Sequence, residues 1–216
     1  MEEKTVSIDI RKDLFGANED AAALNAAKFK EHGIKAFDIM GSVGTGKTQL
    51  IEALCDLIAD QYRILMLAGD LATRIDANRV SSHGVATVQI NTGTACHLDA
   101  RMVKVALNEI NLSDYDVMFI ENVGNLICPA GYSLGAKKKV VVVSVTEGPY
   151  MIRKHPLTVK RADLVVINKI DLAEALEFDV DSLVRDVREV DADIPVLKIS
   201  AKTGEGIKEL AKELGI

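Results

Sequence analysis

The chain has 216 residues, of which 48% are apolar and 27% charged, a composition typical of a soluble globular protein with a sizeable core. Its net charge of −6 argues against a nucleic-acid-binding surface over much of the molecule, and no apolar run approaches the roughly 20 residues of a membrane span. Because Met1–Lys4 lacks the layout of a signal peptide, we expect a cytoplasmic protein with reduced cysteines, no nucleic-acid partner and no membrane partner.

Predicted strands and helices alternate along the chain. Apolar runs predict strands at residues 36–40, 63–68, 86–90, 117–120, 139–145, 164–167 and 196–199. Apolar residues at helical spacing predict helices at 18–31, 49–58, 98–110, 179–190 and 206–214, and residues 71–84 leave room for another. This alternation is typical of the α/β class, with a doubly wound, mainly parallel sheet flanked by helices.

Residues 1–35 precede the first strand of this domain. They carry an Ala-rich helical stretch, and Gly33 is expected to end that helix. Whether this segment packs on the domain or joins two subunits is left open by the sequence. We therefore expect an N-terminal helical segment at 1–35 and a P-loop NTPase domain at 36–216, which together form one structural domain.

Residues 41–48 match the phosphate-binding motif G-x-x-x-x-G-K-[ST] in full, between a predicted strand and a predicted helix. Glycines let backbone N–H groups point inward, and the helix adds its positive N-terminus, so the loop can hold a polyphosphate. Lys47 is expected to reach the β- and γ-phosphates, and the Thr48 hydroxyl to bind Mg²⁺. The residues expected at the phosphates are Gly41, Ser42, Val43, Gly44, Thr45, Gly46, Lys47, Thr48 and Gln49.

Residues 168–171 match the N-K-x-D box of GTP-binding proteins. The Asp171 carboxylate can accept hydrogen bonds from N1–H and the 2-amino group of guanine together, whereas adenine would leave it unpaired. Residues 200–202 resemble the S-A-K box, which supports the base through its backbone. The residues expected to bind guanine are Asn168, Lys169, Asp171, Ser200, Ala201 and Lys202. The order of these motifs favours GTP over ATP, although so short a string alone could be a polar turn.

Residues 121–124 stand where G proteins carry D-x-x-G, with Glu121 in place of the aspartate. A carboxylate there can hold Mg²⁺, and the N–H of Gly124 can approach the γ-phosphate. Asn125 follows Gly124, where the usual water-orienting glutamine is missing, so we expect slow hydrolysis of GTP by the isolated subunit.

Two aspartates after the second predicted strand are further candidate acids. Asp70 and Asp76 could bind Mg²⁺-associated water or orient the attacking water; the alternatives are a solvated loop and a helix cap. The residues expected to act in catalysis are Lys47, Asp70, Asp76 and Glu121. The residues expected around Mg²⁺ are Thr48, Asp76 and Glu121.

Cys96, His97 and Cys128 follow strands whose carboxyl ends could meet at one rim of the sheet. Two thiolates and an imidazole suit Zn²⁺ or Ni²⁺, and a water or a second subunit would complete a tetrahedral site. The alternative is that these cysteines are small apolar core residues. Cys55, within a predicted helix, is assigned to the core.

Together, residues 41–48, Cys96-His97, 121–130 and 168–171 resemble the HypB family, GTPases of nickel–iron hydrogenase maturation in the dimerising SIMIBI branch of P-loop GTPases. The resemblance covers roughly residues 15–215, and its most specific part is 121–130, which joins the hydrolysis loop to a cysteine. It implies a GTP-dependent homodimer that helps deliver nickel to the hydrogenase large subunit, with a nickel-handling accessory maturation protein as partner. It also implies that Cys96, His97 and Cys128 bind Ni²⁺ or Zn²⁺ near the dimer interface.

Three alternatives remain. The first is a urease-type nickel-maturation GTPase, whose hydrolysis loop lacks the continuation seen here at residues 125–129. The second is a regulatory GTPase switch that handles no metal. The third is a GTPase chaperone that loads a cobalamin enzyme. Residues 1–35 contain no cysteine and only His32, so we expect no tight nickel store there. Because Cys128 follows Glu121 closely in the chain, we hypothesise that GTP-driven movement near Asp76 and Glu121 reshapes the metal site and the dimer contact.

Overall fold

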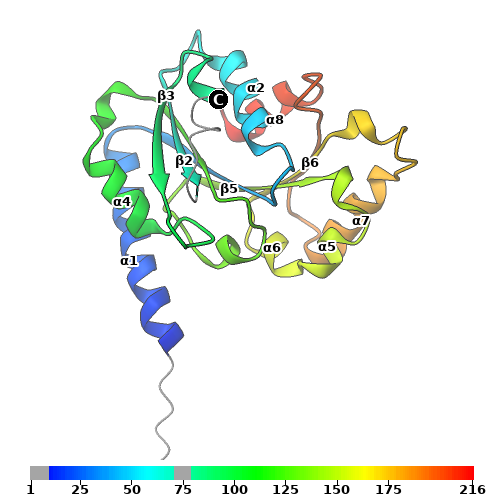
Figure 1. The fold of residues 1–216 in the computed structure, drawn as a ribbon, viewed down its shortest axis with the longest axis horizontal. Coiled ribbons are helices and arrows are strands. Elements are labelled where there is room, and N and C mark those ends of the chain that lie inside the picture. Colours follow the sequence, from blue (N-terminus) through cyan, green and yellow to red (C-terminus); the bar gives the residue numbers. More distant parts are fainter. Residues whose placement is uncertain (1–9, 71–78) are drawn as a thin grey trace, which may run out of the picture.

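The computed structural model describes residues 10–70 and 79–216, and its centre is a seven-stranded sheet in the order β3-β2-β4-β1-β5-β6-β7 (Figure 1). All neighbouring strands pair in parallel. The strands are β1 Lys35–Met40, β2 Ile64–Asp70, β3 Ala86–Asn91, β4 Val117–Glu121, β5 Lys138–Ser144, β6 Leu164–Asn168 and β7 Val196–Lys198. The predicted doubly wound α/β class is therefore confirmed.

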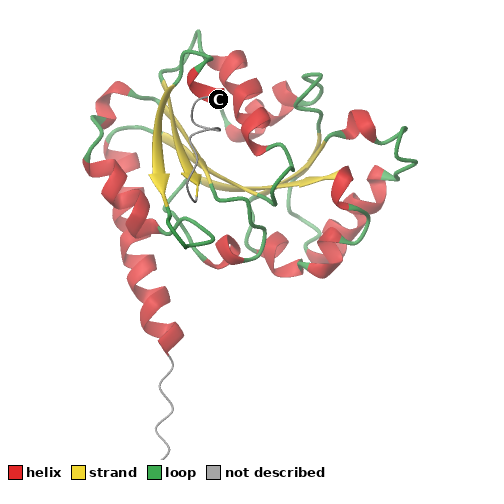
Figure 2. Cartoon of the chain, in the orientation of Figure 1, coloured by secondary structure: helices red, strands yellow, loops and turns green. Residues whose placement is uncertain are grey.

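Helices cover both faces of this sheet (Figure 2). The α-helices are α1 Ile10–Glu31, α2 Lys47–Ile58, α4 Ala100–Asn108, α5 Met151–Lys154, α6 Pro156–Lys160, α7 Val180–Val190 and α8 Ile207–Leu214. A short 3-10 helix, η1 Leu112–Asp114, precedes β4, and three others follow strands: η2 Cys128–Gly131, η3 Val145–Glu147 and η4 Ile170–Leu172. Among the described residues, no helix is long and apolar enough to cross a membrane.

The alternation of side chains along β1 explains how the two layers form. Phe37 and Ile39 pack in the apolar cluster with α2 and α8 on one face. Ala36 and Met40 belong to the clusters on the opposite face, where α4 and α5 to α7 pack. Asp38 stands between them on that second face and is 1% exposed.

The N-terminal helix α1 packs along α4. Asn25, which is 0% exposed, donates hydrogen bonds to the carbonyl groups of Ala100 (2.9 Å) and Leu134 (3.1 Å). Asn18 accepts a 2.8 Å hydrogen bond from the Ala100 N–H. Buried amides bonded across the interface fix the register of α1 against α4, so this helix contacts the domain directly.

The predicted elements differ from the observed ones mainly at their ends. The predicted helix at 98–110 begins only at Ala100, because the Asp99 side chain accepts the Met102 N–H at 2.9 Å and caps the helix. The short helices α5 and α6 were not predicted. The helix expected within 71–84 lies largely outside the described residues. His32 and His83 are exposed, whereas His155 is half-buried.

Candidate functional site

The phosphate loop connects β1 to α2, and its backbone requires glycine. Gly44 and Gly46 have φ values of 82° and 92°, in the left-handed region. A Cβ atom on Gly46 would also lie 2.5 Å from the side-chain amide nitrogen of Asn168. The loop therefore folds directly against the N-K-x-D segment, although the two are distant in sequence.

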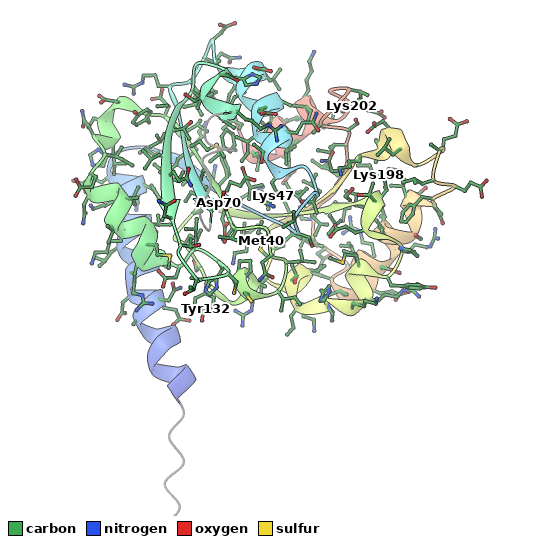
Figure 3. All side chains as sticks on the ribbon, in the orientation of Figure 1. Met40, Lys47, Asp70, Tyr132, Lys198 and Lys202 are labelled. Carbon is green, nitrogen blue, oxygen red and sulfur yellow. The ribbon has the colours of Figure 1, made fainter. Side chains whose placement is uncertain are left out.

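Lys47, at the start of α2, turns back over this loop. Its Nζ donates hydrogen bonds of 3.1 Å to the carbonyl groups of both Gly41 and Ser42, and the residue is 6% exposed. Figure 3 shows Lys47 and Asp70 close together above the middle of the sheet. Both line one cavity of ≈ 450 Å³. Other residues around that cavity are Val43, Gly44, Gly46, Thr48, Gln49, Gly69, Arg79, Glu121, Asn122, Gly124 and Lys169.

Glu121 and Thr48 meet inside this cavity. The Thr48 hydroxyl donates a 2.8 Å hydrogen bond to Glu121 Oε1, and the two residues are 7% and 4% exposed, respectively. A hydroxyl and a carboxylate are the hard oxygen ligands that suit Mg²⁺, so the pair fits that cation. Asp70 ends β2 at the same cavity, half-buried. Asp76 lies outside the described residues.

The loop after β4 approaches the phosphate loop through Gly124. A Cβ atom at Gly124 would lie 2.4 Å from Val43 Cγ2, so the contact depends on the missing side chain. Gly41 and Asn125 form an isolated antiparallel bridge between the same two loops. Backbone contacts therefore join the predicted hydrolysis loop to the phosphate loop.

The predicted guanine-binding residues form one hydrogen-bonded unit. Buried Asn168 donates to the Thr45 carbonyl at 2.8 Å and accepts from the Ala201 N–H at 3.0 Å. The Ser200 hydroxyl donates to Asp171 Oδ1 at 2.6 Å, so a side chain as well as the backbone of this segment is involved. Lys202 follows on the exposed turn.

Lys169 has a left-handed backbone, with φ of 65°, and its Nζ donates to the Gly44 carbonyl. A left-handed conformation is uncommon for a residue with a side chain, and here it directs the lysine over the phosphate loop. The motif segments at 41–48, 168–171 and 200–201 are thus brought together at the carboxyl ends of the strands.

Cys96 lies close both to His97 and to Cys128. Cys96 Sγ lies 3.7 Å from His97 Nδ1, and its hydrogen bond with the Cys128 thiol, together with burial, raises the pKa of Cys96. The His97 ring packs against the Tyr132 ring, with their centroids 4.2 Å apart and their planes tilted by 36°, and burial lowers the pKa of His97. Over residues 16–70 and 79–216, His, Cys, Asp and Glu side chains nevertheless form no preassembled group of three or more metal ligands.

Cys55 behaves differently from the other two cysteines. It is 1% exposed within the apolar cluster beneath α2, and burial raises the pKa of its thiol to about 12. Its assignment to the core is confirmed.

Sequence reasoning missed several polar residues near these loops. Arg79 lines the phosphate-side cavity and forms a 2.7 Å ion pair with Glu52. Asp38 is buried and Lys139 is largely buried, with its side chain 11% exposed, on the opposite face of the sheet. The one sequence signal for this buried pair was the carboxylate of Asp38 inside the apolar run 36–40.

A parallel sheet with a glycine phosphate loop after β1 and an N-K-x-D segment after β6 defines a P-loop GTPase. In a comparison with protein families, the family model described as "CobW/HypB/UreG, nucleotide-binding domain" matches residues 35–198 of this chain. The chain belongs to the CobW/HypB/UreG family.

Several relatives are similar to this chain over almost its whole length. A probable hydrogenase maturation factor HypB of Methanocaldococcus jannaschii is 48% identical, covering 94% of this chain and 92% of the relative. The crystal structure of HypB from Archaeoglobus fulgidus has a TM-score of 0.86 and 40% identity, covering 93% of this chain and 98% of the other. The crystal structure of HypB from Helicobacter pylori in complex with nickel has a TM-score of 0.87 and 34% identity, covering 92% of this chain and 93% of the other.

Proposed function

We propose that this protein is a GTP-hydrolysing metallochaperone that couples its nucleotide state to nickel delivery during nickel–iron hydrogenase maturation. The observation that carries the proposal is the contact of the Cys96 thiol, on the loop after β3, with the Cys128 thiol, on the loop that follows Glu121 beside the phosphate loop. The similarity to HypB proteins, one of them in complex with nickel, supports the same function.

GTP is the proposed substrate, bound by the loop at 41–49 and by Gly124. Asn168, Lys169, Asp171 and residues 200–202 bind the base. Thr48 and Glu121, with Asp76, would hold Mg²⁺, which would neutralise charge on the phosphates. Lys47 contacts the β- and γ-phosphates, and Asp70 faces the same cavity. We expect slow hydrolysis because Asn125 stands where other GTPases use glutamine.

Nickel is the proposed cargo, and Zn²⁺ fits the same ligand chemistry. Cys96, His97 and Cys128 supply two thiolates and a neutral imidazole, which suit a borderline-soft ion. The lowered pKa of His97 favours the neutral, metal-binding form of its ring. Since these side chains are not preassembled, metal binding should draw them together, with a water or a second subunit completing the site.

The proposed partners are a second copy of this chain in a GTP-dependent homodimer, a nickel-handling accessory maturation protein and the hydrogenase large subunit. The proposed location is the cytoplasm, where Cys96 and Cys128 stay reduced and available as ligands.

The proposal is tested by titrating Ni²⁺ into the protein with a non-hydrolysable GTP analogue and with GDP at fixed protein concentration. We expect a different nickel affinity in the two nucleotide states and loss of binding in the Cys96→Ala and Cys128→Ala variants. Cys55→Ala is the control, because it removes a thiol from the core and should leave nickel binding intact. Unchanged nickel binding in the double Cys96→Ala/Cys128→Ala variant would favour a regulatory GTPase instead.

A further inference from the structure

Asp38 is a buried carboxylate that the apolar packing of β1 does not explain. It is 1% exposed, and its Oδ1 accepts a 3.2 Å hydrogen bond from Asn122 Nδ2. Within the described residues, no hydrogen bond reaches its Oδ2, which lies 3.8 Å from Lys139 Nζ. Burial raises the pKa of Asp38 to about 6, against the opposing effects of Lys139 and Asn122. Burying a carboxylate costs free energy unless ion pairs and hydrogen bonds compensate for the lost hydration, so the contacts of Asp38 call for an explanation.

Lys139 uses its other contacts to hold the loop that follows Cys128. It is directly opposite Asp38 in the pairing of β1 with β5. Its Nζ donates to the carbonyl groups of Pro129 (3.2 Å), Ala130 (3.4 Å) and Tyr132 (2.7 Å). One largely buried ammonium group therefore binds three carbonyl groups of the segment 129–132, and the ring of Tyr132 packs against that of His97.

Asn122 holds the other metal-binding segment. Its Oδ1 accepts a 2.9 Å hydrogen bond from the N–H of Leu98, the residue after His97. Its Nδ2 donates to Asp38 at the same time. These contacts form a continuous chain that begins and ends at the Cys96-His97 segment. The ring of His97 packs against Tyr132, whose carbonyl group accepts a hydrogen bond from Lys139. Lys139 pairs with Asp38, Asp38 accepts from Asn122, and Asn122 accepts from the N–H of the residue after His97.

We propose that Asp38, Asn122 and Lys139 form a positioning network that sets the separation of the Cys96-His97 segment from the Cys128 loop. This inference rests on the proposed metal site at Cys96, His97 and Cys128. The three residues touch no metal ligand directly; they act through the backbone of the two segments.

The network also connects this site to the phosphates. Glu121 and Asn122 are consecutive, and the Glu121 carboxylate faces Thr48 on the α2 side of the sheet. The Asn122 amide faces Asp38 on the opposite side. A displacement of Glu121 towards bound nucleotide therefore moves Asn122 and, through Leu98, the Cys96-His97 segment. This route separates at Asn122 from the covalent path along residues 123–128.

The decisive variant is Asp38→Val/Lys139→Met, which replaces the ion pair with apolar side chains closer in size to the originals. Replacing both partners of a buried pair in this way generally preserves stability, so the fold should survive while the hold on the carbonyl groups is lost. Lys138→Met is the matched control: it removes the neighbouring lysine, whose 2.8 Å ion pair with Glu213 lies away from the metal segments.

Two readouts separate this inference from the proposed function. The first is nickel affinity together with the thiolate-to-nickel absorption band, where we expect about a tenfold weaker affinity and a shifted band in the double variant. The second is capture of phenylarsine oxide, which reacts with two nearby thiols and needs no nickel; we expect about a tenfold loss of capture. GTP affinity and thermal unfolding should match those of wild type, and Lys138→Met should change neither readout.

Wild-type arsenical capture in the double variant would overturn the positioning network, whatever happens with nickel. If the wild-type protein bound no nickel but captured the arsenical more strongly than the double variant, the proposed cargo would be wrong and the network would stand. If Lys139→Arg, which keeps the charge, gives the wild-type result in both readouts, that outcome would support the network further.

Discussion

The Thr48 hydroxyl donates a 2.8 Å hydrogen bond to Glu121, joining the end of the phosphate loop to the end of β4. Because both residues are nearly buried, this contact is shielded from water and from competing ions. It places a hydroxyl and a carboxylate at a single point of the cavity that contains Lys47 and Asp70.

Glu121→Gln should slow GTP hydrolysis on the order of 10- to 100-fold, because an amide is a weaker ligand for Mg²⁺ than a carboxylate. The side chains have similar shapes, and the Thr48 hydroxyl can still donate to the amide oxygen. The measurement is single-turnover hydrolysis over a range of Mg²⁺ concentrations. Recovery of the wild-type rate at high Mg²⁺ would place the effect in metal affinity, and a wild-type rate throughout would contradict the assignment.

Asp171→Asn should weaken GTP binding by on the order of 100-fold and favour XTP. Xanthine carries a carbonyl at C2 where guanine carries an amino group, and the asparagine amide can donate to it. Competition binding of GTP, XTP and ATP measures the change. Ser200→Ala is the companion variant: it removes the 2.6 Å hydrogen bond to Asp171 and should cost about tenfold in GTP affinity without changing the base preference. Preference for ATP in the wild-type protein would contradict the guanine assignment.

Gly46→Ala should abolish nucleotide binding and destabilise the protein by about 2 kcal/mol or more. The new Cβ would combine a left-handed backbone with a 2.5 Å approach to Asn168. Gly44→Ala is the matched control, because Gly44 has a similar φ of 82° but nothing within 4 Å of an added Cβ. That variant should cost only about 1 kcal/mol. Denaturant unfolding and nucleotide binding compare the two, and equal effects would show that the contact with Asn168 is unimportant.

The buried Asp38 should make stability fall as pH rises between about 4 and 6. Its pKa is raised from 3.8 to about 6, so the folded state holds the proton more tightly than the unfolded chain over that range. The stabilising effect of proton binding is complete below the unfolded pKa of 3.8 and is lost progressively as the pH rises through the folded pKa of about 6. From pH 4.5 to pH 7 the loss is about 2 kcal/mol for this residue.

The check is denaturant unfolding of wild type and Asp38→Asn at pH 4.5 and pH 7. Asparagine does not titrate, so the stability of the variant relative to wild type should rise by about 2 kcal/mol over that interval. The charged and polar groups around Asp38 come from several elements: Asn122 after β4, Lys139 on β5, Glu19 on α1, and Arg161 and Asp163 before β6. A constant difference between the two proteins would assign the pH dependence to these neighbours.

The fold and the loops that meet at the cavity could be predicted because their signals are local. Apolar runs gave every described strand to within a few residues, and the glycine motif located the phosphate loop. The ends of α4 and the existence of α5 and α6 were missed. A helix of four or five residues, such as α6 beginning at Pro156, has too few turns to show a periodic pattern.

The network around Asp38 could not be predicted because its partners depend on strand order. Asp38 and Lys139 become neighbours only when β1 and β5 pair in the observed register. Asn122 was visible in the sequence as part of the hydrolysis loop, but its hydrogen bond to the N–H of Leu98 crosses between separate loops. The Ser200 hydroxyl at Asp171 was missed for the same reason: its role requires the ends of β6 and β7 to be adjacent.

The placement of Glu121 and Asn122 on opposite sides of one strand end constrains how this protein can change. A substitution that alters the tilt of that strand changes both GTP hydrolysis and metal binding. Selection for a faster GTPase would therefore also alter how strongly the metal cargo is retained. Variants that separate the two properties should then carry compensating changes at residues such as Asp38 or Lys139, far from the nucleotide.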